Sequence, residues 1–461
     1  MSETPTGIAD LSALERINEH KAWYWYDWAN SGYVTTVATV LFAPYLISVA
    51  EKSVGCATGE DAPDCTRNLD VLGVAVSPGS LPFYVVTAAT ILSALVLPIV
   101  GAAADRSSRK PTLMARYAWV GSLAAASMFF VAGENWQLGA LLMFVTNISL
   151  GSSLVVYDAI LCEISTPDER DRVSSRGWAY GYLGGGVLLV ANLALVTLHD
   201  TFGLDQETAV RISLLSAGIW WAAFTFIPYR RIKNRPAVNV VPEHGGLVKE
   251  SFGQLFATLR DLRNYPVTLT FLVAYLFYND GIQTVIATAS TYGEKELGFE
   301  TEVLIATILL VQFLAFGGAL LFGKLAQTHG ARKVVLAGLG LWMVIVTVAY
   351  FIPEDNIALF LALAAGIGLV LGGTQALSRS FFSQLIPRGR EAEYFSLYQA
   401  CERGTSWLGT LIFGLMHQWT DSYRPAVFAL IVFFVIGGAL LWKVDPRRGI
   451  ADAGNQAPSV V

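Results

Sequence analysis

The chain has 461 residues, of which 54% are hydrophobic and only 15% are charged. Soluble domains carry about 25% charged residues, so this composition excludes an ordinary soluble protein and indicates a chain embedded in lipid. The net charge of -5 and the lack of a basic block give no sign of nucleic-acid binding.

The chain begins with a polar, mildly acidic stretch, 1–21, that contains no apolar core before a cleavage site. We expect a cytoplasmic tail there and no signal peptide. Apolar runs of about 20 residues follow, which is the length that a helix needs to cross a bilayer. Twelve spans are predicted, at 22–48, 82–104, 113–132, 137–162, 176–198, 211–228, 265–290, 302–326, 333–352, 356–384, 393–416 and 424–443.

The longest connection, 229–264, follows the sixth span and opens with a basic cluster that begins at Arg230. It divides the spans into two groups of six, which predicts an all-α membrane protein built from two six-helix bundles. The predicted parts are bundles at 22–228 and 265–443, a cytoplasmic linker at 229–264 and a cytoplasmic tail at 444–461. A segment near 247–260 could form an interfacial helix within the linker.

Positive charge follows every second span, and negative charge gathers in the other connections. The basic residues include Arg106, Arg109, Lys110, Arg170, Arg172, Arg230, Arg332, Lys333, Arg388 and Arg390. The acidic residues include Glu60, Asp61, Asp64, Asp200, Asp205, Glu207, Glu294, Glu296, Glu300, Glu354 and Asp355. Lys and Arg are enriched on the cytoplasmic side of membranes, so we expect both termini to be cytoplasmic.

The loop after the first span contains two cysteines, Cys56 and Cys65, and this orientation places it outside. They could form a disulfide bond if the loop faces an oxidising space. Aromatic residues near the start of the first span, including Trp23 and Trp28, are interpreted as part of an interface belt.

The turn after the second span is partly repeated after the eighth span, which indicates an internal duplication. Its motif consists of Gly101, Asp105, Arg106, Arg109 and Lys110. Gly101 allows two helices to approach closely, and Asp105 can accept hydrogen bonds from the backbone amides at a helix start. The turn either sets the topology alone or also acts as a conformational latch, and the two interpretations are compatible.

The same turn resembles the signature of the major facilitator superfamily. Four further segments, 26–31, 174–182, 278–284 and 372–380, resemble the vacuole effluxer-like family, which includes the autophagy-associated amino-acid effluxer of fungal vacuoles and many bacterial members. The resemblance implies a major facilitator fold of twelve transmembrane helices and secondary transport. It leaves the substrate open, because bacterial relatives need not share the fungal substrate.

Several charged side chains lie inside spans, where each needs a partner or a wet cavity because a charge at mid-bilayer costs about 2.5–3.5 kcal/mol. The first half supplies Asp27, Asp158 and Glu163, and the second half supplies Arg379, Glu402 and Arg403. Opposite charges on two rocking halves predict a cytoplasmic gate, which is paired when the inside is shut. The alternative is pairing within each half, for example of Glu402 with Arg379, or side chains that reach water.

Asp280 lies deeper, about 22 Å into the seventh span at 1.5 Å per residue. It would suit the binding of a proton or of a cationic group on a substrate; the alternative is a structural carboxylate bonded to a neighbouring helix. The candidates for the substrate or proton site are Asp27, Asn30, Asn279, Asp280, Gln283 and Gln375.

The sequence therefore predicts a secondary active transporter that moves a small polar solute, with amino acids as the first candidates, by alternating access and with proton coupling as a weaker hypothesis. We expect no cofactor, no metal and no enzymatic activity, because His residues are scattered and catalytic motifs are lacking. The expected partners are a small-molecule substrate, the lipid bilayer (the inner membrane in a bacterium) and protons, with the protein as a monomer. A sensor or scaffold on a transporter fold is the alternative, and a membrane-embedded enzyme is a third interpretation.

Overall fold

The computed structural model describes residues 12–57, 65–71, 73–238, 258, 260–404, 406–420 and 422–461. The first half contains α1 (Ala13–Tyr33), η1 (Val34–Leu41), α2 (Phe42–Ser53), β1 (Leu69–Val71), β2 (Val74–Val76), η2 (Pro78–Ser80), α3 (Leu81–Asp105), α4 (Lys110–Ser127), η3 (Met128–Phe130), α5 (Trp136–Ile164), α6 (Arg170–Thr197), η4 (His199–Phe202) and α7 (Gln206–Arg231). The second half contains η5 (Leu262–Asn264), α9 (Pro266–Lys295), α10 (Thr301–His329), α11 (Ala331–Tyr350), α12 (Ile357–Gln384), α13 (Glu391–Gly404), α14 (Ser406–Thr420), α15 (Tyr423–Ala429), α16 (Ile431–Lys443) and α17 (Pro446–Asp452).

Each predicted span coincides with helical structure in the described part of the chain. The first span comprises α1, η1 and α2, the eleventh comprises α13 and α14, and the twelfth comprises α15 and α16. Nine helical stretches among the described residues are long and apolar enough to cross a bilayer. The other three spans are α4, α9 and the α13–α14 pair; α9 is less apolar because it carries polar residues such as Asn279, Asp280 and Gln283.

Large apolar side chains cover the outer surface of these helices. Phe83 and Ile91 on α3 are 68% and 63% exposed, and Leu123 on α4 is 70% exposed. A soluble protein would leave such a surface in contact with water at a high free-energy cost. The surface is instead suited to lipid, since the helices satisfy their backbone hydrogen bonds internally.

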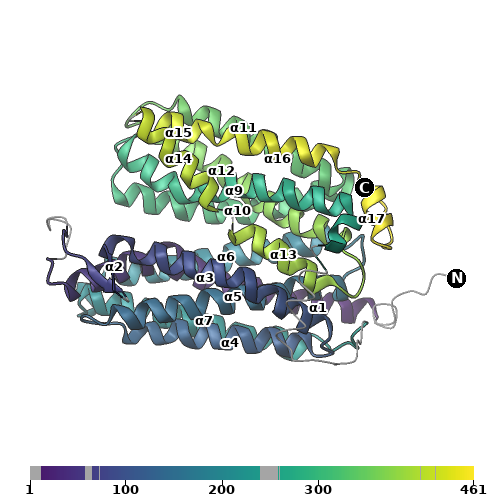
Figure 1. Cartoon of the computed structure of the whole chain (residues 1–461), viewed down its shortest axis with the longest axis horizontal. Coiled ribbons are helices and arrows are strands. Elements are labelled where there is room, and N and C mark those ends of the chain that lie inside the picture. The colour runs from purple at the N-terminus through teal and green to yellow at the C-terminus, as the bar shows by residue number, and fades with distance from the viewer. Residues whose placement is uncertain are drawn as a thin grey trace.

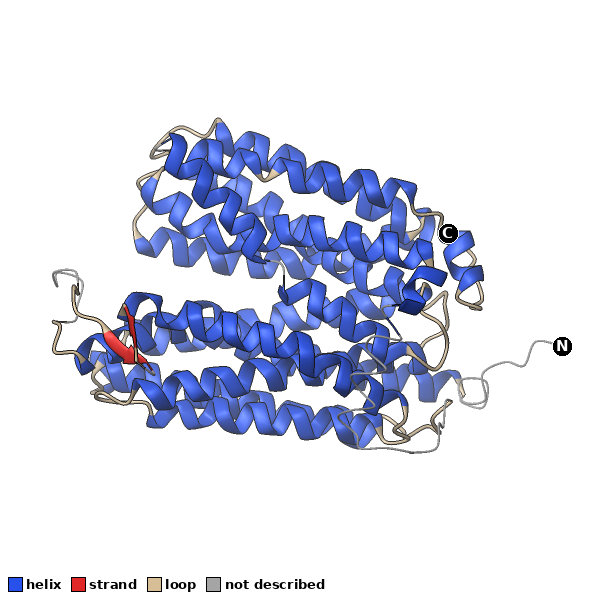
Figure 2. Cartoon of the chain, viewed as in Figure 1, coloured by secondary structure: helices blue, strands red, loops and turns tan. Residues whose placement is uncertain are grey.

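The helices form two bundles that lie one above the other in Figure 1. The first bundle contains α1 to α7 and the second contains α9 to α16. They meet where α6 packs against α10 and α12, and where α3 and α5 pack against α13. The start of α1 and the C-terminus lie at one end of the molecule, which we call the terminus end, and the β1–β2 hairpin lies at the opposite end, the hairpin end (Figures 1 and 2).

The loop at the hairpin end contains the only strands of the described residues. β1 and β2 pair antiparallel with Leu69 opposite Val76, and Cys56 and Cys65 form a disulfide bond just before them. The sequence predicted the loop and its cysteines but not the hairpin, because strands of three residues give too short an alternation of side chains to recognise.

The terminus end contains more helix than the sequence predicted. α1 begins at Ala13 rather than near residue 22, because Ser12 and Glu15 form a capping box. The C-terminal segment, predicted as a tail, contains α17, whose Ile450 is buried. The interfacial helix considered near 247–260 lies almost entirely outside the described residues.

Candidate functional site

Arg379 on α12 lies at the centre of a buried ion cluster between the bundles. Its side chain is 3% exposed, and its guanidinium forms ion pairs with Asp27 of α1 at 3.1 Å and with Asp158 of α5 at 3.3 Å. Nε donates to the Ser174 hydroxyl of α6 at 3.0 Å, and Nη2 donates to the Ser174 carbonyl at 3.1 Å. All of these partners belong to the first bundle, whereas Arg379 belongs to the second.

Aromatic rings enclose the same guanidinium. The guanidinium carbon lies 4.7 Å from the ring centre of Trp23 and 5.4 Å from those of Tyr157 and Trp178. Cations within about 6 Å of a ring centre are attracted by the negative face of the ring. We call Trp23, Asp27, Tyr157, Asp158, Ser174 and Trp178 the arginine cage.

Glycines bring the helices close enough to form the cage. A Cβ atom on Gly177 of α6 would lie 2.5 Å from Oδ2 of Asp27 and 3.2 Å from Nη2 of Arg379, so any side chain there would displace the ion pair. On α12, a Cβ atom on Gly372 would collide with the backbone of Ala315 on α10. The small residues therefore fix the position from which Arg379 reaches the first bundle.

α13 extends the cluster through amide hydrogen bonds. Gln399 donates to Oδ2 of Asp158 at 2.8 Å and to Glu402 at 3.2 Å, and Arg403 donates to the Gln399 amide oxygen at 3.3 Å. The ion pairs of Arg379 among the described residues cross between the bundles, and Glu402 is held by Gln399. The pairing of Glu402 with Arg379, the alternative considered from the sequence, is therefore not adopted.

Glu163 does not join this cluster, although the sequence grouped it with the gate charges. It bonds Lys110 at the start of α4 at 2.6 Å, within the same bundle. Glu163 lies more than one helical turn beyond Asp158 on α5, so it reaches the end of the bundle where Lys110 is available. In this structure Glu163 is paired within its own half, which is the alternative considered from the sequence.

The predicted latch motif makes a second contact between the bundles. The two carboxylate oxygens of Asp105 accept hydrogen bonds of 2.9 Å from the backbone N–H groups of Ala392 and Glu393, in the first turn of α13. A Cβ atom on Gly101 would lie 2.6 Å from the Ala392 carbonyl oxygen, so a glycine is needed there. A carboxylate satisfies the free N–H groups and complements the positive dipole end of a helix start.

The other members of this motif lie around the Asp105 contact. Lys110 lies 3.7 Å from Asp105 and neutralises part of its charge. Arg106 and Arg109 lie in the turn between α3 and α4, and the Arg109 amide donates to the Ser107 hydroxyl. The motif thus connects α3, α4 and α13.

Among the predicted substrate and proton residues, the hydrogen bonds of the described structure join one pair, Asn279 and Gln375. Gln375 donates to the amide oxygen of Asn279 at 2.9 Å, and Asn279 donates to the Glu402 carbonyl at 3.1 Å. Asn30 bonds the Tyr26 carbonyl of its own helix at 2.7 Å. Gln283 is half-buried. The side of each helix on which these residues lie could not be read from the sequence, because it depends on packing between distant segments.

Asp280 is fully buried and faces the eleventh span. Its Oδ2 accepts a hydrogen bond of 3.0 Å from the Gly409 amide of α14. The other oxygen, Oδ1, and the hydroxyl of Thr284 one turn later have no hydrogen-bond partner in the described structure. A carboxylate with one free oxygen in a membrane-spanning helix is unusual, since unpaired buried polar groups are costly.

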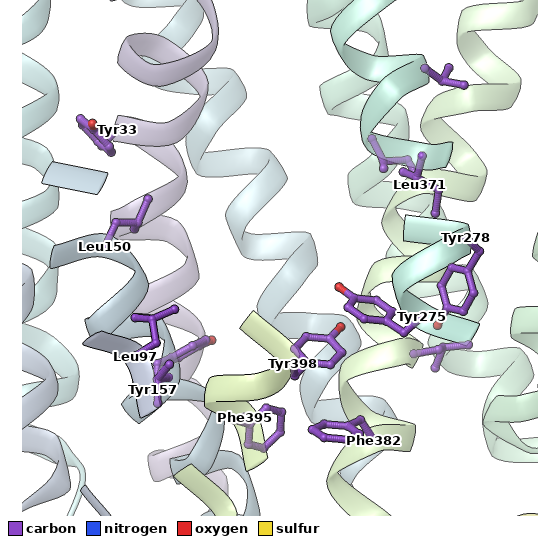
Figure 3. Close-up of a cluster of buried hydrophobic side chains, with 14 of the residues drawn as sticks. Tyr33, Leu97, Leu150, Tyr157, Tyr275, Tyr278, Leu371, Phe382, Phe395 and Tyr398 are labelled. Carbon is purple, nitrogen blue, oxygen red and sulfur yellow. The ribbon is translucent and has the colours of Figure 1, made fainter. Parts of the chain in front are cut away.

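Aromatic side chains pack beside the ion cluster at the terminus end. Figure 3 shows Tyr398 and Phe395 of α13 with Phe382 of α12, between Tyr157 of the first bundle and Tyr275 of the second. Tyr398 stacks on Tyr275 and Phe382, with ring centres 4.2 Å and 5.2 Å apart. These buried rings exclude water from the surroundings of the ion pairs. The attraction between the paired charges is stronger there, because it is screened less than in water.

Sequence reasoning missed several cage residues. Trp23 was assigned to the interface belt, but it is fully buried, stacks on Tyr157 at 4.2 Å and contacts Arg379. That interpretation was wrong because nearness to a helix end does not reveal which way a ring points. The spacing of Trp23 and Asp27, one helical turn apart, is the signal that could have linked them.

Comparisons with known proteins agree with this architecture. The family described as vacuole effluxer Atg22 like matches residues 16–454. The chain is 29% identical over 440 residues to the uncharacterized MFS-type transporter YxiO of Bacillus subtilis, covering 95% of this chain and 97% of that protein. It is 25% identical over 537 residues to autophagy-related protein 22 of Pyricularia oryzae, covering 96% and 78%.

Solved structures with the same fold include the E. coli fucose:proton symporter FucP, with a TM-score of 0.67 and 12% identity over 94% of this chain and 99% of that one. A bacterial homologue of the iron transporter ferroportin in an outward-facing state matches with a TM-score of 0.65 and 14% identity over 93% and 99%. These likenesses show the fold, and they confirm the twelve-helix, two-bundle arrangement predicted from the sequence. The chain is a multi-pass membrane protein of the MFS transporter type, and it belongs to the vacuole effluxer Atg22-like family.

Proposed function

We propose that this transporter moves small polar solutes, with amino acids as the first class to test, by alternating access between its two bundles. The observation that carries the proposal is the set of ion pairs from Arg379 of the second bundle to Asp27 and Asp158 of the first. Charges divided in this way between two bodies favour a gate, because they pair when the bodies meet and must find water or other partners when they part.

The contacts between the bundles support a state that is closed at the terminus end. Besides the ion cluster and the Asp105 contact, Arg170 donates to the Ser383 carbonyl at 2.8 Å and Ser174 donates to the Ala376 carbonyl at 2.7 Å. We place the terminus end in the cytoplasm because the connections there carry the Lys and Arg excess. The described conformation is then the one that is shut toward the cytoplasm.

Separating the bundles would leave the two carboxylates in the cage without their cation. Removing one partner from a buried ion pair typically costs about 3–5 kcal/mol unless water or another charge replaces it. The gate therefore opens only when water or another charged group replaces Arg379 beside the carboxylates. Opening of the terminus end thus depends on the binding of water or a solute there.

A disulfide across the gate tests alternating access. The Sγ atom of the native Cys162 on α5 lies 3.9 Å from the Ser383 carbonyl oxygen on α12, so Ser383→Cys introduces a second thiol at the residue that Cys162 contacts. In proteoliposomes loaded with labelled amino acids, oxidation of this variant should reduce flux at least tenfold, and a reductant should restore it. The same variant with Cys162→Ser is the control and should not respond to oxidant. Full flux through the cross-linked protein would contradict the proposal.

Proton coupling through Asp280 or Asp27 forms a second part of the proposal. Asp280 has one oxygen without a partner and a single backbone N–H bonded to the other, so it can take up a proton without breaking an ion pair. Asp280→Asn should abolish solute accumulation driven by a pH gradient while leaving solute exchange intact. The measurement is uptake into proteoliposomes with and without the gradient, and normal accumulation by the variant would remove Asp280 from the coupling path.

A further inference from the structure

The arginine cage belongs entirely to one bundle, while its cation comes from the other. Trp23 and Asp27 lie on α1, Tyr157 and Asp158 lie on α5, and Ser174 and Trp178 lie on α6. Arg379 is therefore seated in the first bundle as a ligand would be, with its guanidinium 3% exposed.

The cage matches the chemistry of an organic cation in several respects. Carboxylates from two helices bond the edges of the guanidinium, at 3.1 Å and 3.3 Å. Three aromatic rings lie around it at 4.7–5.4 Å from their centres. Carboxylates that bond the N–H edges, together with rings that face the cation, form the arrangement by which proteins recognise guanidinium and ammonium groups.

Among the described residues, no cation of the first bundle forms an ion pair with these carboxylates. The ion pairs of Asp27 and Asp158 among the described residues are both with Arg379. Lys110, the lysine of the latch motif at the start of α4, forms ion pairs with Glu163 and Asp105. When α12 moves away, the cage retains two carboxylates and three rings but loses its positive charge.

We propose that the arginine cage is the binding site for a solute that carries a guanidinium, or an ammonium group at the end of its side chain, and that Arg379 and this solute take turns in it. This inference rests on the proposed alternating access and names the class of solute. The solute enters the cage when the terminus end opens, and the return of Arg379 displaces it when that end closes. Arg379 thus acts as a tethered competitor of the transported cation.

Ligand selectivity of the unmodified protein gives the first test. L-arginine and L-citrulline have almost the same shape, but citrulline carries a neutral urea group in place of the guanidinium, and agmatine carries the guanidinium without the carboxylate. In thermal unfolding of the purified protein in nanodiscs, L-arginine and agmatine should raise Tm at concentrations at least tenfold below that of L-citrulline. Equal effects of the three compounds, or no effect from any of them, would overturn the proposal.

Chemical rescue gives a second test that does not depend on transport. Arg379→Ala empties the cage, so methylguanidinium at millimolar concentration should restore the lost Tm, and L-arginine should bind this variant at least tenfold more tightly than the wild type. Addition of Asp158→Asn to the variant should abolish the rescue. Arg211→Ala is the matched control, because Arg211 stacks on Phe129 at 4.8 Å and bonds a carbonyl but lies outside the cage. Rescue of the control alone, or of neither variant, would contradict the proposal.

The two proposals can fail separately. If neutral and cationic amino acids are transported at similar rates, and L-arginine binds no more tightly than L-citrulline, alternating access stands but the cation site is rejected. The opposite result is also possible to distinguish. If L-arginine binds selectively but the Ser383→Cys variant still transports after its disulfide to Cys162 has formed, the cation site is kept and the gate is rejected. If Arg379→Ala cannot be purified, the wild-type comparison of L-arginine with L-citrulline decides the proposal alone.

Discussion

Gly101 and Asp105 hold the start of α13 against α3 in two different ways. Asp105 supplies both acceptors for the first free amides of α13, and Gly101 supplies the space that the α13 backbone occupies. The nearest atom to an added Cβ is a backbone carbonyl oxygen rather than the end of a flexible side chain. At this position the helices cannot adjust without moving as whole elements.

We expect Gly101→Ala to destabilise the described conformation, because overpacking of a tight contact typically costs about 1–3 kcal/mol. Thermal unfolding of the purified protein measures the effect as a lower Tm. Gly340→Ala on α11 is the matched control, since nothing lies within 4 Å of a Cβ atom added there. At this half-buried position within a helix, where an added methyl group meets no neighbour, the change should be neutral or stabilise by up to about 1 kcal/mol. Equal Tm values for the two variants would show that the α3–α13 contact accommodates the added methyl group without cost.

Among the elements, the C-terminal segment after α16 joins parts of both bundles. The side-chain amide of Asn455 donates to the carbonyls of Gln384 and Ile386 at 2.9 Å and 2.7 Å, at the end of α12. The backbone amide of Ser459 donates to the Asp168 carboxylate in the α5–α6 connection at 2.6 Å. The segment is anchored to the second bundle and bonded to the first, so it resists separation of the bundles at the terminus end.

We expect a chain shortened to end at Asp445 to open more often at the terminus end. The readout is the rate at which N-ethylmaleimide labels the native Cys162, which is 9% exposed and lies against α12, in a Cys401→Ser background. Ser459→Pro removes only the backbone donor to Asp168 and should raise the rate by a smaller factor. Asp452→Ala alters an exposed ion pair on α17 and should leave the rate unchanged. An unaltered rate in the shortened chain would rule out this role.

For the whole molecule, the ends differ in charge, because the connections at the terminus end carry the Lys and Arg excess. We expect the hairpin end to face outside and the terminus end to face the cytoplasm. Cysteines introduced at two exposed positions test this: Val74→Cys in β2 and Arg448→Cys in α17, at which the native side chains are 62% and 67% exposed. A maleimide that cannot cross membranes should label only the first in intact cells and both after the cells are opened. Labelling of both in intact cells would place the two ends on one side.

The sequence predicted the spans well and the site partly, for physical reasons. The length of an apolar run sets whether a helix crosses the bilayer, so each of the twelve spans could be located from composition. Depth along a helix also follows from residue number, which is why Asp27, Asp158 and Arg379 could be placed near one level. Which side of a helix faces its neighbour depends on packing between distant segments, so the contact of Asp280 with Gly409 and the stacking of Trp23 could not be foreseen.

The β1–β2 hairpin and its disulfide-closed loop have a practical consequence for imaging. A 49.9 kDa helical protein lies mostly inside a detergent or lipid belt, where particles look alike from many directions. The hairpin lies at the end of the molecule opposite α17 and the start of α1 (Figures 1 and 2). An antibody fragment raised against this hairpin would serve as an orientation marker in electron micrographs while leaving the bundles free to move.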